Sequence, residues 1–459
     1  MKLKSAATLL VLGCLLSAPV RAAKITIGDQ GGFVDVGAIV QTWARITQDG
    51  NAAHTGVSTD FFFRRMRIYV NGAINDHIGI IANTDISYTQ AGAAASDVIT
   101  NPVTQQNSVR FASPTIVLNE ALGYYSFCRE LIFMAGLQLL PWVRQTATDI
   151  TKFSALDEQG DVTERGRPAG FFGRNRDLGL AIRGLLFNNI ISYKVGIFNG
   201  VQTIAGKSTV TASGLVTGPT NVAVNFPAYT GVNPGDAPSY DGYVRVNFLG
   251  YEPDYSLLGI AYNGQSYFAV GGGANIQPRA VAAPARGVSG ATYQGYFMDL
   301  HLDLPFNEMF GEFVVEAGWV RTVYSGNGAP ISSVSGQNLI NNAGNGIYGS
   351  VGVRLGVIYP YFAFEDYMSN LNGQQVQSTY LVFGGATWGD PASGRVGSLQ
   401  TYHVGFKFFV SPPPGNQFLI DLDLAFQNKQ NAGQPTLAND GLPINGNQFS
   451  GILEFQFKI

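Results

Sequence analysis

The chain has 459 residues, of which 46% are hydrophobic and 12% aromatic, whereas only 13% are charged. Ordinary soluble domains have about 25% charged residues, and no run of about 18 apolar residues predicts a membrane-spanning helix. The formal net charge of −3 excludes the basic surface that nucleic-acid binding requires. The composition favours a transmembrane β-barrel, in which lipid-facing and lumen-facing residues alternate along each strand.

The N-terminus, residues 1–22, predicts a secretory signal peptide. Two lysines precede an apolar run over 6–16, and a Val-Arg-Ala triplet that ends at Ala22 provides the cleavage site. A lipoprotein site at Cys14 is a less favoured alternative. Residues 23–459 would form a single barrel domain, with a net charge of −6 because three of the 28 basic residues leave with the signal against 31 acidic ones.

Sixteen segments after the signal alternate apolar and polar residues, as a strand does when its two faces differ. The connections between them are alternately short and long, which is typical of outer-membrane barrels with short periplasmic turns and long extracellular loops. A seventeenth strand over 256–262 would break that alternation, so 251–265 is expected to be an enlarged periplasmic turn. We therefore predict an all-β fold, a 16-stranded antiparallel transmembrane β-barrel with strands at 33–45, 62–74, 77–88, 116–126, 130–139, 176–187, 190–199, 240–250, 266–276, 292–304, 309–323, 345–356, 359–367, 399–410, 417–428 and 449–459.

The second segment, FFFRRMRIYV, places arginines inside an otherwise apolar strand. Arg65 and Arg67 alternate with an apolar set that includes Phe62 and Ile68, so the arginines are expected on the opposite face. Arg64 breaks the alternation at the entrance of the strand. Because a barrel of sixteen strands encloses an aqueous channel, the two alternating arginines are predicted to point into a pore.

The same alternation predicts charges along the whole lumen, leaning basic on the early strands and acidic on the later ones. An alternative is that these charges only pair across neighbouring strands. The candidate pore-lining residues are Arg65, Arg67, Arg176, Arg183, Lys194, Arg245, Asp299, Asp303, Glu312 and Glu316.

The connection 140–175 is the candidate constriction loop. Its 36 residues exceed what a plain connector needs. If the loop folds into the lumen, it would narrow the channel near Arg65 and Arg67. Basic groups facing Asp299, Glu312 and Glu316 would create a transverse field, which suits small polar or dipolar solutes, whereas a ring of one sign selects one ion. The basic residues of the loop are Arg144, Lys152, Arg165, Arg167 and Arg174.

No catalytic residue, cofactor or metal is predicted. The chain lacks the G-x-S-x-G, H-E-x-x-H and G-x-x-x-x-G-K-[ST] motifs, although an outer-membrane esterase or protease stays open. Asp299, His301 and Asp303 share one face. Neighbours at i and i+2 lie about 6.6 Å apart on a strand, so a hydrated charge cluster is favoured over a metal site.

Several stretches carry a resemblance to a known family. They are FFFRRMRIYVNGAI in the second strand, NEALGYYSF and FMAGLQLLPW around the fourth and fifth, and RNRDLGLAIRG and ISYKVGIFNG around the sixth and seventh. In these stretches the chain resembles the phosphate-selective porin family, porins O and P, in order along the mature sequence.

The resemblance implies a homotrimeric outer-membrane porin whose third outer loop folds inward. It places Arg65, Arg67 and the Arg176-Asp177 pair at positions of the family's motifs. Leu139 and Ala363 stand where the family commonly has a lysine and an arginine.

These observations predict an outer-membrane porin of a Gram-negative-type cell. It would give passive diffusion of small polar or charged solutes through a mixed-charge constriction, with a modest anion preference. Its partners would be membrane lipids including lipopolysaccharide, further copies of the chain, and the solutes, but no nucleic acid. The alternatives are a phosphate- or anion-specific porin and, from another class, a structural or adhesive surface barrel without an open pore.

Overall fold

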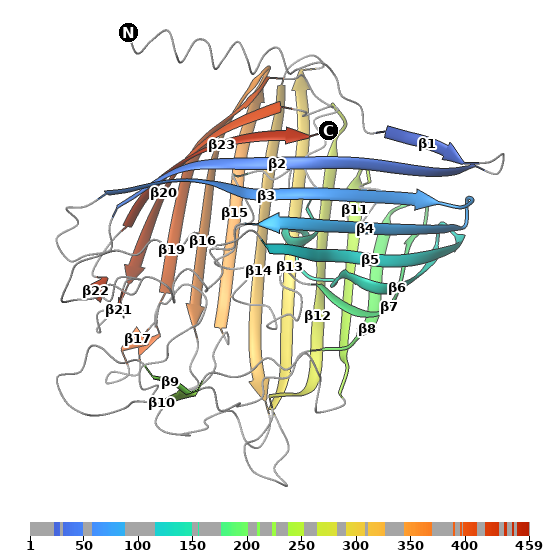
Figure 1. Cartoon of the computed structure of the whole chain (residues 1–459), viewed down its shortest axis with the longest axis horizontal. Helices are drawn as coiled ribbons and strands as arrows, with labels where there is room; N and C mark the ends of the chain where they lie inside the picture. Colours follow the sequence, from blue (N-terminus) through green and yellow to red (C-terminus); the bar gives the residue numbers. More distant parts are fainter. Residues whose placement is uncertain are drawn as a thin grey trace.

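The alternating segments form strands that close into a barrel. The computed structural model describes residues 23–27, 31–48, 57–87, 115–148, 155, 176–200, 209–211, 223–225, 237–251, 264–281, 291–307, 311–325, 344–369, 389–390, 395–396, 398–410, 418–430, 436–437, 443–444 and 448–458. Within these ranges, sixteen strands pair antiparallel with their neighbours in a ring that β23 closes against β2 (Figure 1). The predicted 16-stranded antiparallel β-barrel is confirmed.

Each of the sixteen predicted segments corresponds to one strand of the ring, with ends that differ by a few residues. The signal peptide 1–22 and residues 252–263 of the enlarged turn lie outside the described residues. The barrel strands are β2 (Gly32–Gln48), β3 (Val57–Ala73), β4 (Ile78–Ser87), β5 (Thr115–Cys128), β6 (Leu131–Leu139), β7 (Arg176–Leu186), β8 (Ile191–Phe198), β11 (Ser239–Leu249), β12 (Tyr267–Val281), β13 (Ala291–Asn307), β14 (Gly311–Ser325), β15 (Gly344–Leu355), β16 (Ile358–Ser369), β19 (Ser398–Phe409), β20 (Phe418–Gln430) and β23 (Gln448–Lys458).

Small elements lie outside the ring. Three two-stranded sheets come from the long connections, and η1 (Arg144–Ala147) is a single 3-10 turn after β6. Among the described residues, no helix is long and apolar enough to cross a membrane. The small sheets pair β9 (Thr209–Thr211) with β10 (Ala223–Asn225), β17 (Gly389–Asp390) with β18 (Arg395–Val396), and β21 (Thr436–Leu437) with β22 (Pro443–Ile444).

The outward face of the barrel is apolar. Ile80, Val244 and Met298 point outward and are 51%, 45% and 56% exposed, while the residues between them face the interior. A closed antiparallel barrel with this alternation is the architecture of bacterial outer-membrane proteins, because every backbone polar group is paired and the apolar face meets lipid. The predicted location in the outer membrane is confirmed.

An additional strand, which the sequence did not predict, lies at the seam. β1 (Ala23–Ile27) pairs antiparallel with the first part of β2, from Gly32 to Val36. β23 pairs with the later part of β2, from Ile39 to Thr47. β1 and β23 therefore lie one after the other along the same edge of β2 (Figure 1).

A β-bulge in β3 corrects the predicted orientation of Phe62. Gln41 of β2 pairs with Arg65, whereas the next residue, Thr42, pairs with Phe63, so Arg64 is the extra residue of the bulge. The alternation of faces changes at that point. Phe62 lies opposite Trp43, with ring centroids 5.8 Å apart, and not on the lipid-facing side that Ile68 occupies.

Candidate functional site in the barrel lumen

The interior wall of the barrel carries charged side chains from most strands, and most of them are buried. Arg65 is 2% exposed, Arg245 1% and Asp303 0%. Charges with so little contact with solvent need partners close by. The partners decide which of the predicted site residues come together.

The predicted arginines of β3, Arg65 and Arg67, have different neighbours, and Arg67 lies beside Asp85, the one acidic residue of β4. Arg67 pairs with Asp85 across the two strands, and Nη2 of Arg67 lies 3.2 Å from Oδ2 of Asp85. Arg65 lies next to the bulge, directly opposite Gln41. The extra residue, Arg64, places its guanidinium 5.0 Å from the centroid of the Trp43 ring. The bulge therefore sets the face on which Arg65 and Arg67 stand.

The start of the candidate constriction loop, residues 140–148, lies inside the barrel. It leaves β6 and reaches β13, which is separated from β6 by four strands of the ring, and the next strand, β14. Trp142 packs on Phe297 of β13, with ring centroids 4.7 Å apart, and is 1% exposed. Val143 belongs to the same buried cluster, which also contains Tyr243, Val320 and Tyr348.

Arg144 fixes this segment to two carboxylates of the far wall. Its backbone amide donates a hydrogen bond of 2.8 Å to Oδ2 of Asp299. Its guanidinium donates to Oε1 of Glu316 and forms a buried ion pair. The hydroxyl of Tyr243 donates to the other oxygen of Asp299 at 2.8 Å. Arg144, Asp299 and Glu316, three predicted site residues, are thus in direct contact and do not face each other across an open gap.

Glycines in the wall make room for these contacts. A Cβ at Gly295 of β13 would lie 2.8 Å from the Trp142 ring, and a Cβ at Gly271 of β12 would lie 2.1 Å from the Tyr243 hydroxyl. Cβ atoms essentially never come closer than 3.0 Å to other heavy atoms. The small residues therefore allow the segment to press against the wall.

Two predicted pore-lining residues contact the wall where the loop 140–175 begins and where it ends. Nζ of Lys194 donates to the carbonyl oxygen of Leu139, the last residue of β6, at 2.6 Å. Arg176, the first residue of β7, lies 3.9 Å from Glu120 through its Nε atom. Asp177 accepts a 2.6 Å hydrogen bond from the amide of Gly200. Lys194 and Arg176 thus support the points where the chain leaves and re-enters the wall.

A second contact between the loop and the wall lies nearer the periplasmic ends of the strands. Ala155 is buried against Tyr361 and Phe409 in one apolar cluster. Nζ of Lys407 donates to the carbonyl oxygen of Ala155 at 2.6 Å and to Oδ2 of Asp421 at 2.7 Å. The loop therefore touches β13 and β14 at Arg144 and β19 at Ala155.

The remaining predicted residues have separate surroundings. Arg354 of β15 lies 3.5 Å from Glu312, and Arg245 donates to the hydroxyl of Ser192 at 3.3 Å. Arg183 and Lys194 are cross-strand neighbours on β7 and β8. Lys152, Arg165, Arg167 and Arg174 lie outside the described residues.

Sequence reasoning missed the aromatic side chains of this site. Trp142, Tyr243 and Phe297 pack together where the segment meets the wall. Trp142 follows Pro141 directly after a strand, and an apolar residue at the start of a long polar loop is the signal that could have indicated an inward course. Within the described residues, no group of three or more His, Cys, Asp or Glu side chains is placed to hold a metal ion.

No family model matches the sequence, and no curated protein matches it either. Solved structures similar to the chain include the anion-selective porin from Comamonas acidovorans, at 11% identity and a TM-score of 0.49, covering 93% of this chain and 100% of the porin. OmpF of Salmonella typhi, solved in complex with daunomycin, has 11% identity, a TM-score of 0.49 and coverage of 94% and 100%. The outer membrane channel DcaP of Acinetobacter baumannii has 11% identity, a TM-score of 0.46 and coverage of 95% and 100%. The resemblance to the phosphate-selective porin family stays a prediction.

Proposed function

We propose that the protein is an outer-membrane porin through which small polar or charged solutes diffuse passively, with a modest anion preference. The observation that carries this proposal is the segment 140–148 inside the barrel, held on the far wall by Arg144. A sixteen-stranded barrel is wide enough for an aqueous channel. A segment fixed across part of that width narrows the channel and leaves the rest of it open, as a constriction loop does.

The charges around the segment support modest selectivity. Arg144 offsets Glu316, and Asp85 offsets Arg67. The lumen residues that the structure describes therefore do not form a ring of one sign, which is what strong ion selectivity requires. Arg65, next to the bulge on β3, adds a positive charge to the same part of the wall as Arg67, and we expect a small preference for anions from these two residues.

The narrower alternative, a phosphate-specific channel, finds less support. Stripping water from phosphate would require several cations at one height of the lumen. Lys194 is instead engaged with the Leu139 carbonyl, and Lys407 with the Ala155 carbonyl and Asp421. These two lysines hold the loop.

The proposal includes a homotrimer in the outer membrane of a Gram-negative-type cell. Large apolar side chains stand far out from the early strands, with Phe61 78% exposed and Ile116 68% exposed. A side of the barrel with such side chains suits contact with a neighbouring copy or with lipid.

A second candidate function, a surface barrel without an open pore, is favoured by one observation. Asp421 and Asp423 of β20 and Asp303 of β13 have no exposed surface although they point inward. Carboxylates that are covered in this way do not meet permeating ions, and a barrel that does not conduct has no need for them to do so. Conductance separates the two candidates.

Planar-bilayer recording of the refolded protein under a KCl gradient tests the proposal. Wild type is expected to open in steps of three and to show a small anion preference, and Arg65→Ala with Arg67→Ala is expected to shift the reversal potential toward cations. Arg129→Ala, at an exposed periplasmic turn, serves as the control and is expected to leave the reversal potential unchanged. Folded, heat-modifiable barrels that never conduct would establish the surface barrel instead.

A further inference from the structure

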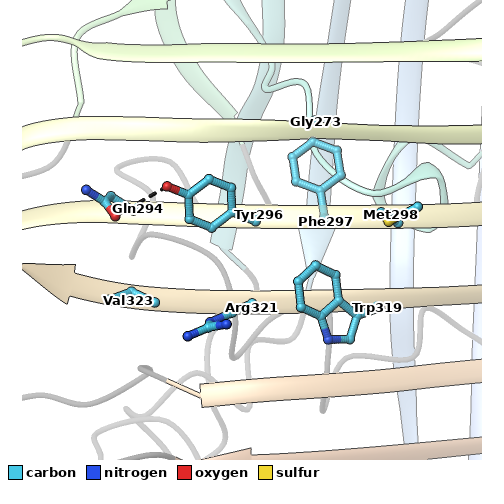
Figure 2. A pocket seen from close by; sticks show the side chains of 8 residues that line it. All are labelled: Gly273, Gln294, Tyr296, Phe297, Met298, Trp319, Arg321 and Val323. Carbon is cyan, nitrogen blue, oxygen red and sulfur yellow. Dashed lines mark hydrogen bonds between the residues drawn. The ribbon is translucent and has the colours of Figure 1, made fainter. Parts of the chain in front are cut away.

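A groove lies on the outward face of the barrel, away from the lumen. It has a volume of about 550 Å³ and runs between β13 and β14. Figure 2 shows Gln294, Tyr296 and Met298 along β13 and Trp319 and Arg321 along β14. Tyr296 is the cross-strand neighbour of Arg321. The groove therefore combines a cation, hydrogen-bonding groups and apolar side chains on a surface that meets the membrane.

The groove lies at the extracellular edge of the apolar band. Arg321 is ten residues further along β14 than Gly311, the residue at the periplasmic end. With a rise of about 3.3 Å per residue and a strand tilt of about 40°, Arg321 stands about 25 Å from that end, which equals the height of the apolar band of such barrels. Phe313 and Val315, which precede it on the outward face, are apolar.

Arg321 is unusual on this face. It is the one cation among the outward-facing described residues of β12, β13, β14, β15 and β16, and it is exposed. In the described part of the chain its guanidinium has no hydrogen bond or ion pair with another residue. Asp366, an acidic residue on β16, accepts a hydrogen bond from Gln400 and not from Arg321. An arginine at the membrane edge is expected to meet an anion there, because phosphate-bearing headgroups lie at that height.

The neighbours of Arg321 complete a site for a phosphate with attached acyl chains. The hydroxyl of Tyr296 and the amide of Gln294 lie 3.3 Å apart and present polar atoms beside the guanidinium. Trp319 lies two residues from Arg321 toward the membrane centre, and Met298, opposite it, is 56% exposed. The polar groups thus point to a headgroup and the apolar ones to lipid tails.

We propose that this groove binds the phosphate of an outer-leaflet glycolipid of the lipid A type. Arg321 forms a charge-assisted, two-pronged hydrogen bond with the phosphate oxygens, and the side-chain NH2 of Gln294, whose oxygen accepts a hydrogen bond from the Tyr296 hydroxyl, donates another. The acyl chains lie on Met298 and Trp319. The site requires only the orientation of the barrel in the outer membrane, so it holds whether or not the lumen conducts.

Native mass spectrometry of the refolded barrel in detergent tests the site, with bisphosphorylated and dephosphorylated lipid A as probes. Wild type is expected to retain the bisphosphorylated form, with at least about tenfold weaker binding in Arg321→Gln. Arg129→Gln is the matched control, since Arg129 also lies beside a tyrosine, 5.7 Å from the Tyr251 ring, but at the periplasmic end. Arg321→Lys keeps the charge but cannot form the two-pronged hydrogen bond, so its binding is expected to lie between that of wild type and that of Arg321→Gln.

Three results would overturn the site. Equal binding of the dephosphorylated lipid would show that acyl chains alone are held, and equal losses in Arg129→Gln would show unspecific attraction. If Arg321→Gln dissociates an oligomer in lipid-free detergent, a neighbouring copy occupies the groove. A heat-modifiability gel for each variant establishes that it is folded before binding is compared.

Discussion

The backbone amide of Arg144 and the carboxylate of Asp299 are joined by a hydrogen bond of 2.8 Å. These residues belong to the segment after β6 and to β13, on different sides of the lumen. The bond uses the backbone of Arg144, so its guanidinium is available for Glu316. One residue therefore holds the segment at two carboxylates of neighbouring strands.

Glu316→Gln is expected to release the segment 140–148. Breaking a buried ion pair by removing one partner leaves an uncompensated charge, which typically costs about 3–5 kcal/mol, and Arg144 must then leave the wall. Single-channel recordings should show a larger and noisier conductance. Asp299→Asn should have a smaller effect, because the remaining side-chain oxygen still accepts the hydrogen bond from the Arg144 amide.

Glu454→Gln is the control for this release. Glu454 is an equally buried carboxylate of the wall, but it accepts hydrogen bonds from Gln41 and Trp43 of the neighbouring strand. Its loss should lower the unfolding temperature without changing the noise of the open channel. Quiet, unchanged currents in Glu316→Gln would show that the segment does not set the constriction.

Gly295→Ala is expected to displace the Trp142 ring. The added Cβ would lie 2.5 Å from the Tyr293 hydroxyl and 2.8 Å from two ring atoms of Trp142, so both side chains must move and the packing of Trp142 on Phe297 is weakened. We expect a lower unfolding temperature and an increase in tryptophan fluorescence at longer wavelength. Gly123→Ala is the control, since the nearest atom to its Cβ lies at 3.9 Å, and equal spectra for both variants would contradict the packing.

Arg67 and Asp85 are expected to act on selectivity with opposite signs. Asp85→Asn leaves Arg67 without its ionised partner at 3.2 Å, so the lumen becomes more positive and the reversal potential should move toward anions. Arg67→Gln should move it toward cations. The double variant should return near wild type, and a double variant that equals either single one would show that only one of the two groups meets permeating ions.

Deletion of Arg64 is expected to be tolerated. Arg64 is the extra residue between Phe63, which pairs with Thr42, and Arg65, which pairs with Gln41. Its removal turns the bulge into a regular ladder and leaves the other side chains on their faces. The refolded barrel should keep its gel mobility and lose the contact of Arg64 with Trp43.

Deletion of Met66 is the counterpart of this experiment. It places Arg65 and Arg67 next to each other, so that one of them must face lipid. Arginine on the lipid face costs about 2–4 kcal/mol near the bilayer midplane. The Met66 deletion should refold poorly, and equal yields for both deletions would contradict the bulge at Arg64.

The strands could be predicted from the sequence because their side chains obey one period. A residue such as Ile68 must meet lipid and its neighbour Arg67 must not, and this constraint repeats along every strand. The alternation of short and long connections then gives the strand number. The predicted face of Phe62 was wrong because a bulge inserts one residue and changes the face. Arg64 breaks the alternation, but a single break does not distinguish an inserted residue from the end of a strand.

The candidate site was less predictable, since its contacts join residues far apart in the chain. Alternation places Asp299 and Glu316 on the inward face but does not say that Arg144 touches both. Lys194 was expected to line the pore, yet it binds a backbone carbonyl at Leu139. Such pairings depend on where a loop crosses the interior, which no local period encodes.

The two strands along the edge of β2 bear on how the ring closes. β1 and β2 are local in sequence and can pair early, whereas β23 arrives only after the remaining strands have formed. Lys458 pairs with Ile39, close to the end of β1, where Ala23 pairs with Val36. If β23 slid four residues toward Gly32, Lys458 would collide with β1 at Asp35. The hairpin of β1 and β2 thus blocks further sliding of β23 toward Gly32, which limits the registers in which β23 can pair with β2 and close the barrel.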